Sequence, residues 1–178
     1  MIVCAVAITL SLSAQTPPVR EKIMLFERHT WNAEDATDSI PGYERSMHHV
    51  EKTVFVPSSW KGSDITFVSL GANQEVTLYV NGTRVGYHAG GYTAFSMDVT
   101  PYIVAGQDNT IAADITNAHN ADIPPLSADF TFFGGFYRDN YLLRTNKKHF
   151  STTYFGTQGI IIDNNAVRQC PNGWNVTA

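Results

Sequence analysis

The polar residues best suited to binding a ligand gather around one proline-rich stretch, residues 118–128. Asp129 ends this stretch, and its carboxylate can only accept hydrogen bonds, through two oxygens. Amide, imidazole and further carboxyl groups stand nearby: Asn117, His119, Asn120 and Asp122. Loops on a rigid scaffold often carry binding groups, although Asn and Asp are also ordinary loop residues. We therefore take Asp129, Asn117 and His119 as candidate ligand contacts, with a local structural role as the alternative for each.

Signals for other chemistry are missing from the sequence. The six histidines have no metal-ligand spacing, and the adjacent His48 and His49 would face opposite ways in a strand, so we expect no transition metal. There is no phosphate-binding loop, no nucleophile elbow and no Cys-His site. The formal net charge is -4, with no basic cluster beyond Lys147 and Lys148. This charge balance argues against a nucleic-acid partner.

The start of the chain predicts export. The first charged residue is Arg20, and residues 2–12 are almost wholly apolar. This pattern predicts a signal peptide over residues 1–15 and a secreted or periplasmic protein, with a buried strand or helix as the alternative. The apolar run is shorter than the roughly 20 residues of a membrane anchor. Removal of Cys4 with the signal would leave Cys170 as the single cysteine, so we expect no internal disulfide.

Short strands are the elements that must position the candidate residues. Runs of β-branched and aromatic residues recur between Gly, Pro, Asn and Asp, without helical periodicity. Strands are predicted over residues 49–56, 64–70, 75–80, 83–88, 95–99, 110–116 and 141–145. Such regular spacing predicts an all-β sandwich or barrel. Residues 31–43 and 118–128 are expected to be irregular surface loops.

Two local patterns specify how these strands pair. Apolar residues alternate with polar ones along residues 75–80 and 111–115, so each strand should bury one face. Asn81 and Gly82 stand between two strand patterns, and both positions of a two-residue hairpin turn need a positive φ. We therefore predict a tight hairpin at Asn81-Gly82.

An ordered set of motifs runs through the middle of the chain. The motifs are Val56-Pro57 with Trp60-Lys61-Gly62, Leu78 to His88, Gly90-Gly91-Tyr92, Phe95 with Asp98-Val99-Thr100, Gly106 to Asn109, and Phe133 to Asp139. In this order and spacing, over residues 41–143, they resemble the N-terminal sugar-binding domain of family 2 glycoside hydrolases, β-galactosidases among them. Each motif alone is weak, whereas the ordered set is specific. Asn140 departs from the family, which usually has Val there.

The resemblance implies a fold and a domain order. It implies a jelly-roll, galactose-binding-like β-sandwich over residues 16–150. Residues 151–178 would be a linker and the incomplete start of an immunoglobulin-like β-sandwich domain, with a strand at Gly159–Ile162. In the parent chain a TIM barrel with two catalytic glutamates would follow.

The resemblance also implies that the chemistry lies elsewhere in the parent enzyme. A retaining glycosidase needs two carboxyl groups about 5–5.5 Å apart, and in this family the acid/base Glu follows an Asn. This sequence has no Asn-Glu pair, and its six glutamates all lie between Glu21 and Glu75. We therefore expect a fragment of an exported hydrolase of O-glycosidic bonds, leaning to β-galactosides, that is inactive by itself.

Within this family an Asp at the position of Asp129 reaches into the active-site pocket of the barrel. There it accepts hydrogen bonds from sugar hydroxyls, and in some galactosidases it helps to hold a sodium ion. The resemblance thus implies a carbohydrate substrate, no required cofactor, and sodium as a candidate ligand of Asp129 in the full-length enzyme.

Several conspicuous residues of the motifs are expected to be structural. We expect Arg138 to fix its strand through a carboxylate or backbone carbonyls, and Gly134 and Gly135 to allow close backbone approach or an unusual φ. Packing is favoured over sugar stacking for the loop aromatics Phe130, Phe132 and Phe133.

Two further functions stay open on the sequence. One is a stand-alone carbohydrate-binding module without hydrolase activity, because jelly rolls commonly bind glycans through surface aromatics. The other is a structural domain that mediates subunit contacts, and a homo-oligomer of the full-length enzyme stays open with it.

Overall fold

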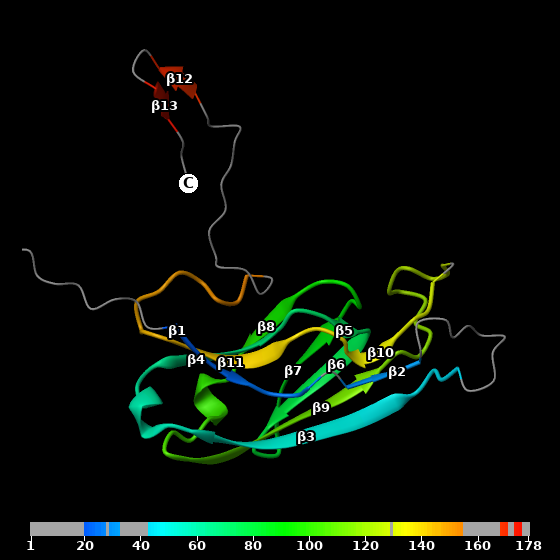
Figure 1. Ribbon diagram of the computed structural model, residues 1–178, viewed down its shortest axis with the longest axis horizontal. Helices are drawn as coiled ribbons and strands as arrows, with labels where there is room; N and C mark the ends of the chain where they lie inside the picture. The colour runs from blue at the N-terminus through cyan, green and yellow to red at the C-terminus, as the bar shows by residue number, and fades with distance from the viewer. Residues whose placement is uncertain are drawn as a thin grey trace, which may run out of the picture.

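The computed structural model describes residues 20–27, 29–32, 43–128, 130–154, 168–170 and 173–175, which form strands and two short 3-10 helices (Figure 1). The strands are β1 (Arg20–Met24), β2 (His29–Trp31), β3 (Met47–Val56), β4 (Asp64–Ser69), β5 (Ala72–Asn73), β6 (Glu75–Val80), β7 (Thr83–Ala89), β8 (Phe95–Asp98), β9 (Gln107–Thr116), β10 (Gly134–Phe136), β11 (Asn140–Thr145), β12 (Arg168–Cys170) and β13 (Gly173–Asn175). The 3-10 helices are η1 (Ser58–Trp60) and η2 (Thr100–Tyr102). None of the helices in these ranges has the length and apolarity to cross a bilayer.

The strands of the sandwich form two antiparallel layers. One layer is sheet A, in the order β1-β11-β4-β8, with the smaller sheet B, in the order β2-β10-β5. Along the chain, β2 follows β1, β5 follows β4, and β10 precedes β11. Sheet B is therefore a continuation of sheet A, separated from it by short interruptions in these strands. The other layer is sheet C, in the order β3-β9-β6-β7. The strands β12 and β13 pair with each other.

The pairing follows the predicted local patterns. Asn81 and Gly82 have φ angles of 50° and 77° and join β6 to β7, which confirms the hairpin. In β6, buried residues alternate with half-buried ones as predicted, and β9 buries Ile111, Ala113 and Ile115 on one face. The core lies between the two layers and includes Val76, Leu78 and Val80 of β6, Ile65 and Phe67 of β4, and Leu142 of β11.

The structure differs from the sequence prediction at six short strands, four in the sandwich and the pair β12 and β13. The strands β1, β2, β5 and β10 were not predicted, and the prediction of a loop over residues 31–43 is wrong at Trp31, which ends β2. Three of the four have only two or three residues, and β10 begins with two glycines, which weaken a strand taken by itself. In sheet B, β10 pairs with both β2 and β5, and in sheet A β1 pairs with β11, so their neighbours specify these strands rather than their own sequence.

The remaining predictions fall in two groups. Residues 118–128 contain no strand, as predicted. The signal peptide over residues 1–15 and the strand at Gly159–Ile162 lie outside the described residues and stay predictions.

Candidate functional site

The candidate site is the loop end of the sandwich, which we define as residues 117–128 and 130–133 with the side chains that touch them. This segment leaves β9 and leads into β10, and it lies at one end of the two layers (Figure 1). Asp129 itself lies outside the described residues. Its contact with sugar and its sodium ion therefore stay predictions.

Asn117 is fully buried directly after β9, with an exposed fraction of 0%. Its amide Nδ2 donates to the backbone carbonyls of Glu44, at 2.8 Å, and Phe132, at 3.3 Å, and its Oδ1 accepts from the Ser46 N–H at 2.9 Å. Both amide protons are used in this way. Such burial does not fit the predicted direct contact with sugar. Asn117 instead ties three segments of the loop end together.

Asn32 repeats this arrangement from the end of β2. Its Oδ1 accepts from the Glu44 N–H at 2.7 Å, and its Nδ2 donates to the carbonyls of Glu44, at 2.9 Å, and Phe132, at 3.1 Å. Its φ of 69° is a left-handed conformation that Asn adopts more readily than most residues. The sequence analysis missed Asn32, because a single Asn beside a predicted loop is too common to be a signal.

The first part of the loop is fixed to sheets B and C, while His119 is exposed. Gln74 Nε2 donates to the Ala118 carbonyl at 2.6 Å, and Asn120 Nδ2 donates to Glu75 Oε1 at 3.2 Å. Among the described residues, His119 has no hydrogen-bonding partner. Its imidazole is therefore available at the surface, and its role in sugar contact stays a prediction.

Aromatic side chains form part of the surface of the loop end. Phe130 and Tyr92 are 49% and 41% exposed, and their rings meet edge to face with centroids 6.0 Å apart. Phe132 is buried 5.4 Å from Phe130, and the Arg45 guanidinium lies over its ring at 4.4 Å. Phe132 thus packs, as predicted, whereas Phe130 presents an aromatic face immediately after Asp129.

Close backbone approach shapes the structure beneath these aromatics. A Cβ on Gly134 would lie 1.7 Å from Trp31 Cε2, and one on Gly135, whose φ is 95°, would lie 1.9 Å from the His29 carbonyl oxygen. The Trp31 ring also stacks on His48 with centroids 3.9 Å apart. The predicted close approach at both glycines is confirmed. Trp31 as the partner could not be found from the sequence, because β2 and β10 are about 100 residues apart in the chain.

Tyr137 and Arg138, between β10 and β11, bond to backbone carbonyls of neighbouring segments of the same chain. The Tyr137 hydroxyl donates to the Gly91 carbonyl at 2.7 Å. Arg138 Nη1 lies 3.4 Å from the Leu70 carbonyl, which agrees with the expected structural role of this arginine.

The surroundings shift the pKa values of one carboxyl and two phenol groups at the loop end. Hydrogen bonds from the Ser46 hydroxyl and then from the His48 ring lower the pKa of the Glu44 carboxyl below its ordinary value. Burial raises the pKa of Tyr92 and that of Tyr137. Fixed hydrogen bonds and exposed aromatic rings suit recognition of a ligand. The described residues contain no group of three or more His, Cys, Asp or Glu side chains placed to hold a metal ion.

Comparison with known proteins agrees with the motifs of the sequence. Residues 30–146 match the family model described as "Glycosyl hydrolases family 2, sugar binding domain". A β-glucuronidase of Bacteroides fragilis is 34% identical over 134 residues, and a β-galactosidase of Thermoanaerobacter pseudethanolicus is 38% identical over 103 residues. These alignments cover 75% and 56% of this chain but only 19% and 14% of the two relatives.

A solved structure extends the likeness to the fold. Bacteroides uniformis β-glucuronidase 2, covalently bound to cyclophellitol-6-carboxylate aziridine, is 31% identical with a TM-score of 0.70. The match covers 85% of this chain and 20% of that protein. The chain thus spans about a fifth of the length of the proteins that it resembles.

Proposed function

The chain belongs to glycosyl hydrolase family 2, as the sugar binding domain of that family, and from this premise we propose that it is the N-terminal domain of a longer glycoside hydrolase. The match of the family model over residues 30–146 carries this proposal. Since the chain covers 19% of its Bacteroides fragilis relative, we assign hydrolysis of the O-glycosidic bond to the remaining part of the protein. The apolar start of the sequence supports export of the protein.

We infer that the substrate is a β-glucuronide. The sequence analysis leaned to β-galactosides on overall likeness. The names of the relatives with the widest coverage favour β-glucuronidase, and one structural neighbour bears that name and is covalently bound to cyclophellitol-6-carboxylate aziridine, a molecule named for its carboxylate. A β-galactoside remains the second candidate, because β-galactosidases also match over 103 residues. A retaining mechanism with two carboxyl groups would then operate in the remaining part of the enzyme.

The loop end is the part of this domain that would contact substrate. We assign sugar contact to Asp129 and His119, and the support of their loop to Asn117. The exposed ring of Phe130 next to Asp129 supports this assignment, because a carboxylate and an apolar face together match a sugar with hydroxyl and C–H surfaces. The same exposed ring favours a second candidate function, a carbohydrate-binding module that acts without a barrel.

Kinetics of the full-length protein test the proposal. The enzyme should cleave p-nitrophenyl β-glucuronide faster than the matching galactoside, and Asp129→Ala should lower kcat/KM about fivefold or more, because a lost sugar hydrogen bond costs on the order of 1 kcal/mol or more. Asp122→Ala, in the same exposed loop, is the matched control. A change within twofold for Asp129→Ala would remove our role for this residue.

Calorimetry of the 178-residue chain decides between the two functions. We expect no sub-millimolar binding of glucuronic acid, galactose or lactose, because the proposed pocket would be completed only by the barrel. Sub-millimolar binding that Asp129→Ala abolishes would instead support the stand-alone module.

A further inference from the structure

The two large sheets differ in what lies on their outer faces. In β6 of sheet C, buried residues alternate with half-buried ones, as expected for an antiparallel sheet with one solvated face. In sheet A, by contrast, five of six residues are buried in both β4 and β11. The two central strands of sheet A are therefore buried on both faces, and something besides the core must cover their outer face, whereas the edge strands β1 and β8 are more exposed.

The outer face of sheet A carries its own apolar cluster. Val68, Tyr141 and Leu143 form a cluster separate from the main core, with Leu70 packed against it. The register places Tyr141 opposite Val68, and Leu143 opposite the buried Thr66. The corresponding face of sheet C is polar and carries Thr77, Tyr79 and Asp114 side by side. Only the outer face of sheet A thus has the composition of an interior surface.

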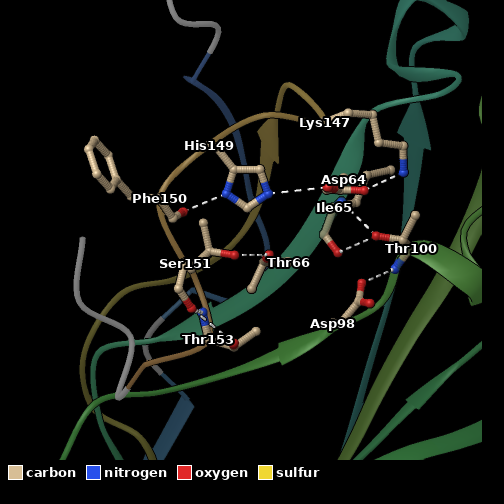
Figure 2. A network of polar contacts seen from close by, with 11 residues as sticks. Asp64, Ile65, Thr66, Asp98, Thr100, Lys147, His149, Phe150, Ser151 and Thr153 are labelled. Carbon is tan, nitrogen blue, oxygen red and sulfur yellow. Dashed lines mark hydrogen bonds and ion pairs between the residues drawn. The ribbon is translucent and has the colours of Figure 1, made fainter. Parts of the chain in front are cut away.

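A segment that we call the strap, residues 146–154, crosses this face after β11. Figure 2 shows Lys147 and His149 of the strap reaching Asp64 of β4, and the His149 contact has a nitrogen–oxygen distance of 3.2 Å. Farther along, the hydroxyls of Thr152 and Thr66 lie 2.7 Å apart, and both residues are buried. Ion pairs at one end and a buried hydroxyl pair at the other hold the strap on the sheet.

Large apolar side chains remain exposed on and beside the strap. Phe150 is 70% exposed, and in Figure 2 its ring points away from the polar network. Tyr154 is 46% exposed at the end of the strap, and Met24 on the adjacent β1 is 50% exposed. A contiguous exposed apolar patch marks an interaction surface, and Phe150 and Tyr154 stand four residues apart on the strap.

We propose that the strap and the outer face of sheet A are the surface on which the next folded domain of the same polypeptide packs. The inference rests on the proposed place of this domain within a longer hydrolase. The described part of the strap ends at Tyr154, beside this surface, and the relatives continue for about four times the length that the chain covers. A domain tethered at this point has a high effective concentration there, which a separate partner lacks.

Hydrogen exchange of the full-length protein tests this surface. Phe150→Asp should raise the exchange rate of the strap about tenfold or more, because loss of the docked domain lets the segment open locally. Phe55→Asp is the matched control, since Phe55 is 58% exposed on the outer face of sheet C. This control should leave exchange of the strap unchanged. In the 178-residue chain, neither variant should change exchange of the strap.

The outcomes are separate from the proposed activity, because exchange is measured without substrate. Equal exchange of the strap in the two full-length variants would overturn the proposal, even in an active glucuronidase. A dimeric 178-residue chain in size-exclusion light scattering, made monomeric by Phe150→Asp, would overturn it in favour of a second copy. Phe150→Ala repeats the test if the charged variant of the full-length protein does not fold.

Discussion

The loop end and the strap both hold an irregular segment against the sandwich, but they do so with different chemistry. At the loop end, the buried amide of Asn117 and the amide of Asn32 bond to backbone groups of neighbouring segments. On the strap, the partly exposed carboxylate of Asp64 pairs with Lys147 and His149. The loop end is held mainly by neutral groups, and the strap mainly by charges.

This difference determines how firmly each segment is held. Removing a buried amide leaves its backbone partners unpaired away from water, which costs about 1–3 kcal/mol for each group. Exposed ion pairs contribute about 0–1 kcal/mol and weaken with salt. We therefore expect the stability that Asn117 and Asn32 give to the loop end to be insensitive to pH and salt. The stability of the strap on the sheet should depend on both.

Gly134→Ala should cause the largest loss of stability, because it disrupts the packing beneath the loop end. The new Cβ would lie 1.7 Å from Trp31 Cε2 and 2.1 Å from Trp31 Cζ2, where the ring is buried between strands. Overpacking of this kind should cost about 3 kcal/mol or more of the free energy of unfolding, measured by urea denaturation of the 178-residue chain. Gly86→Ala is the control, because its Cβ meets only the flexible Met97 side chain at 3.0 Å. Equal losses in the two variants would contradict this account.

Asn117→Ala should come second, with a loss of about 2–3 kcal/mol in the free energy of unfolding. The change leaves the Ser46 N–H without its side-chain partner and removes one of the two amide donors from each of the Glu44 and Phe132 carbonyls. Because the groups involved are neutral, the loss should be the same at pH 6 and pH 9 in denaturant titrations. Asn120→Ala, whose amide bonds to the carboxylate of Glu75, should cost about 1 kcal/mol or less. If the loss in the free energy of unfolding of the Asn117 variant depended strongly on pH, neutral hydrogen bonds would not be what holds the loop end.

Thr152→Val should have a smaller effect, on the buried part of the strap. It preserves side-chain volume but leaves the Thr66 hydroxyl without its partner at 2.7 Å, at a cost of about 1 kcal/mol. Thermal unfolding measures the loss, and the exposed Thr153→Val is the control. If Thr152→Val and Thr153→Val have the same melting temperature, the hydroxyl pair does not hold the strap.

Asp64→Asn should have the smallest effect at pH 7, about 1 kcal/mol or less. The Lys147 hydrogen bond, followed by that from His149, holds the pKa of the Asp64 carboxyl below its ordinary value of 3.8. A carboxyl with a lowered folded-state pKa stabilises the protein above pH 3.8, and this contribution disappears as the pH falls through the folded-state pKa. The difference in stability between wild type and variant should therefore vanish in acid and shrink in high salt. A difference that persists under both conditions would mean that the charges are not the cause.

The sequence by itself determined most strands of the sandwich and its family. The alternation in β6 and β9 reports which face is buried, because side chains of a strand point to opposite sides in turn. Asn81-Gly82 determines its hairpin because both positions need a positive φ. These signals are local, so they can be found without the rest of the chain.

Only the tertiary structure decided how the candidate site is built. It brings Trp31 onto Gly134, joins Asn32 and Asn117 to the same carbonyls, and buries Asn117, for which the sequence predicted sugar contact. It also shows that β4 and β11 at the centre of sheet A are buried on both faces, whereas the apolar residues of β4 are equally compatible with burial on one side. In each case the deciding partner lies tens of residues away along the chain, and no local pattern contains that information.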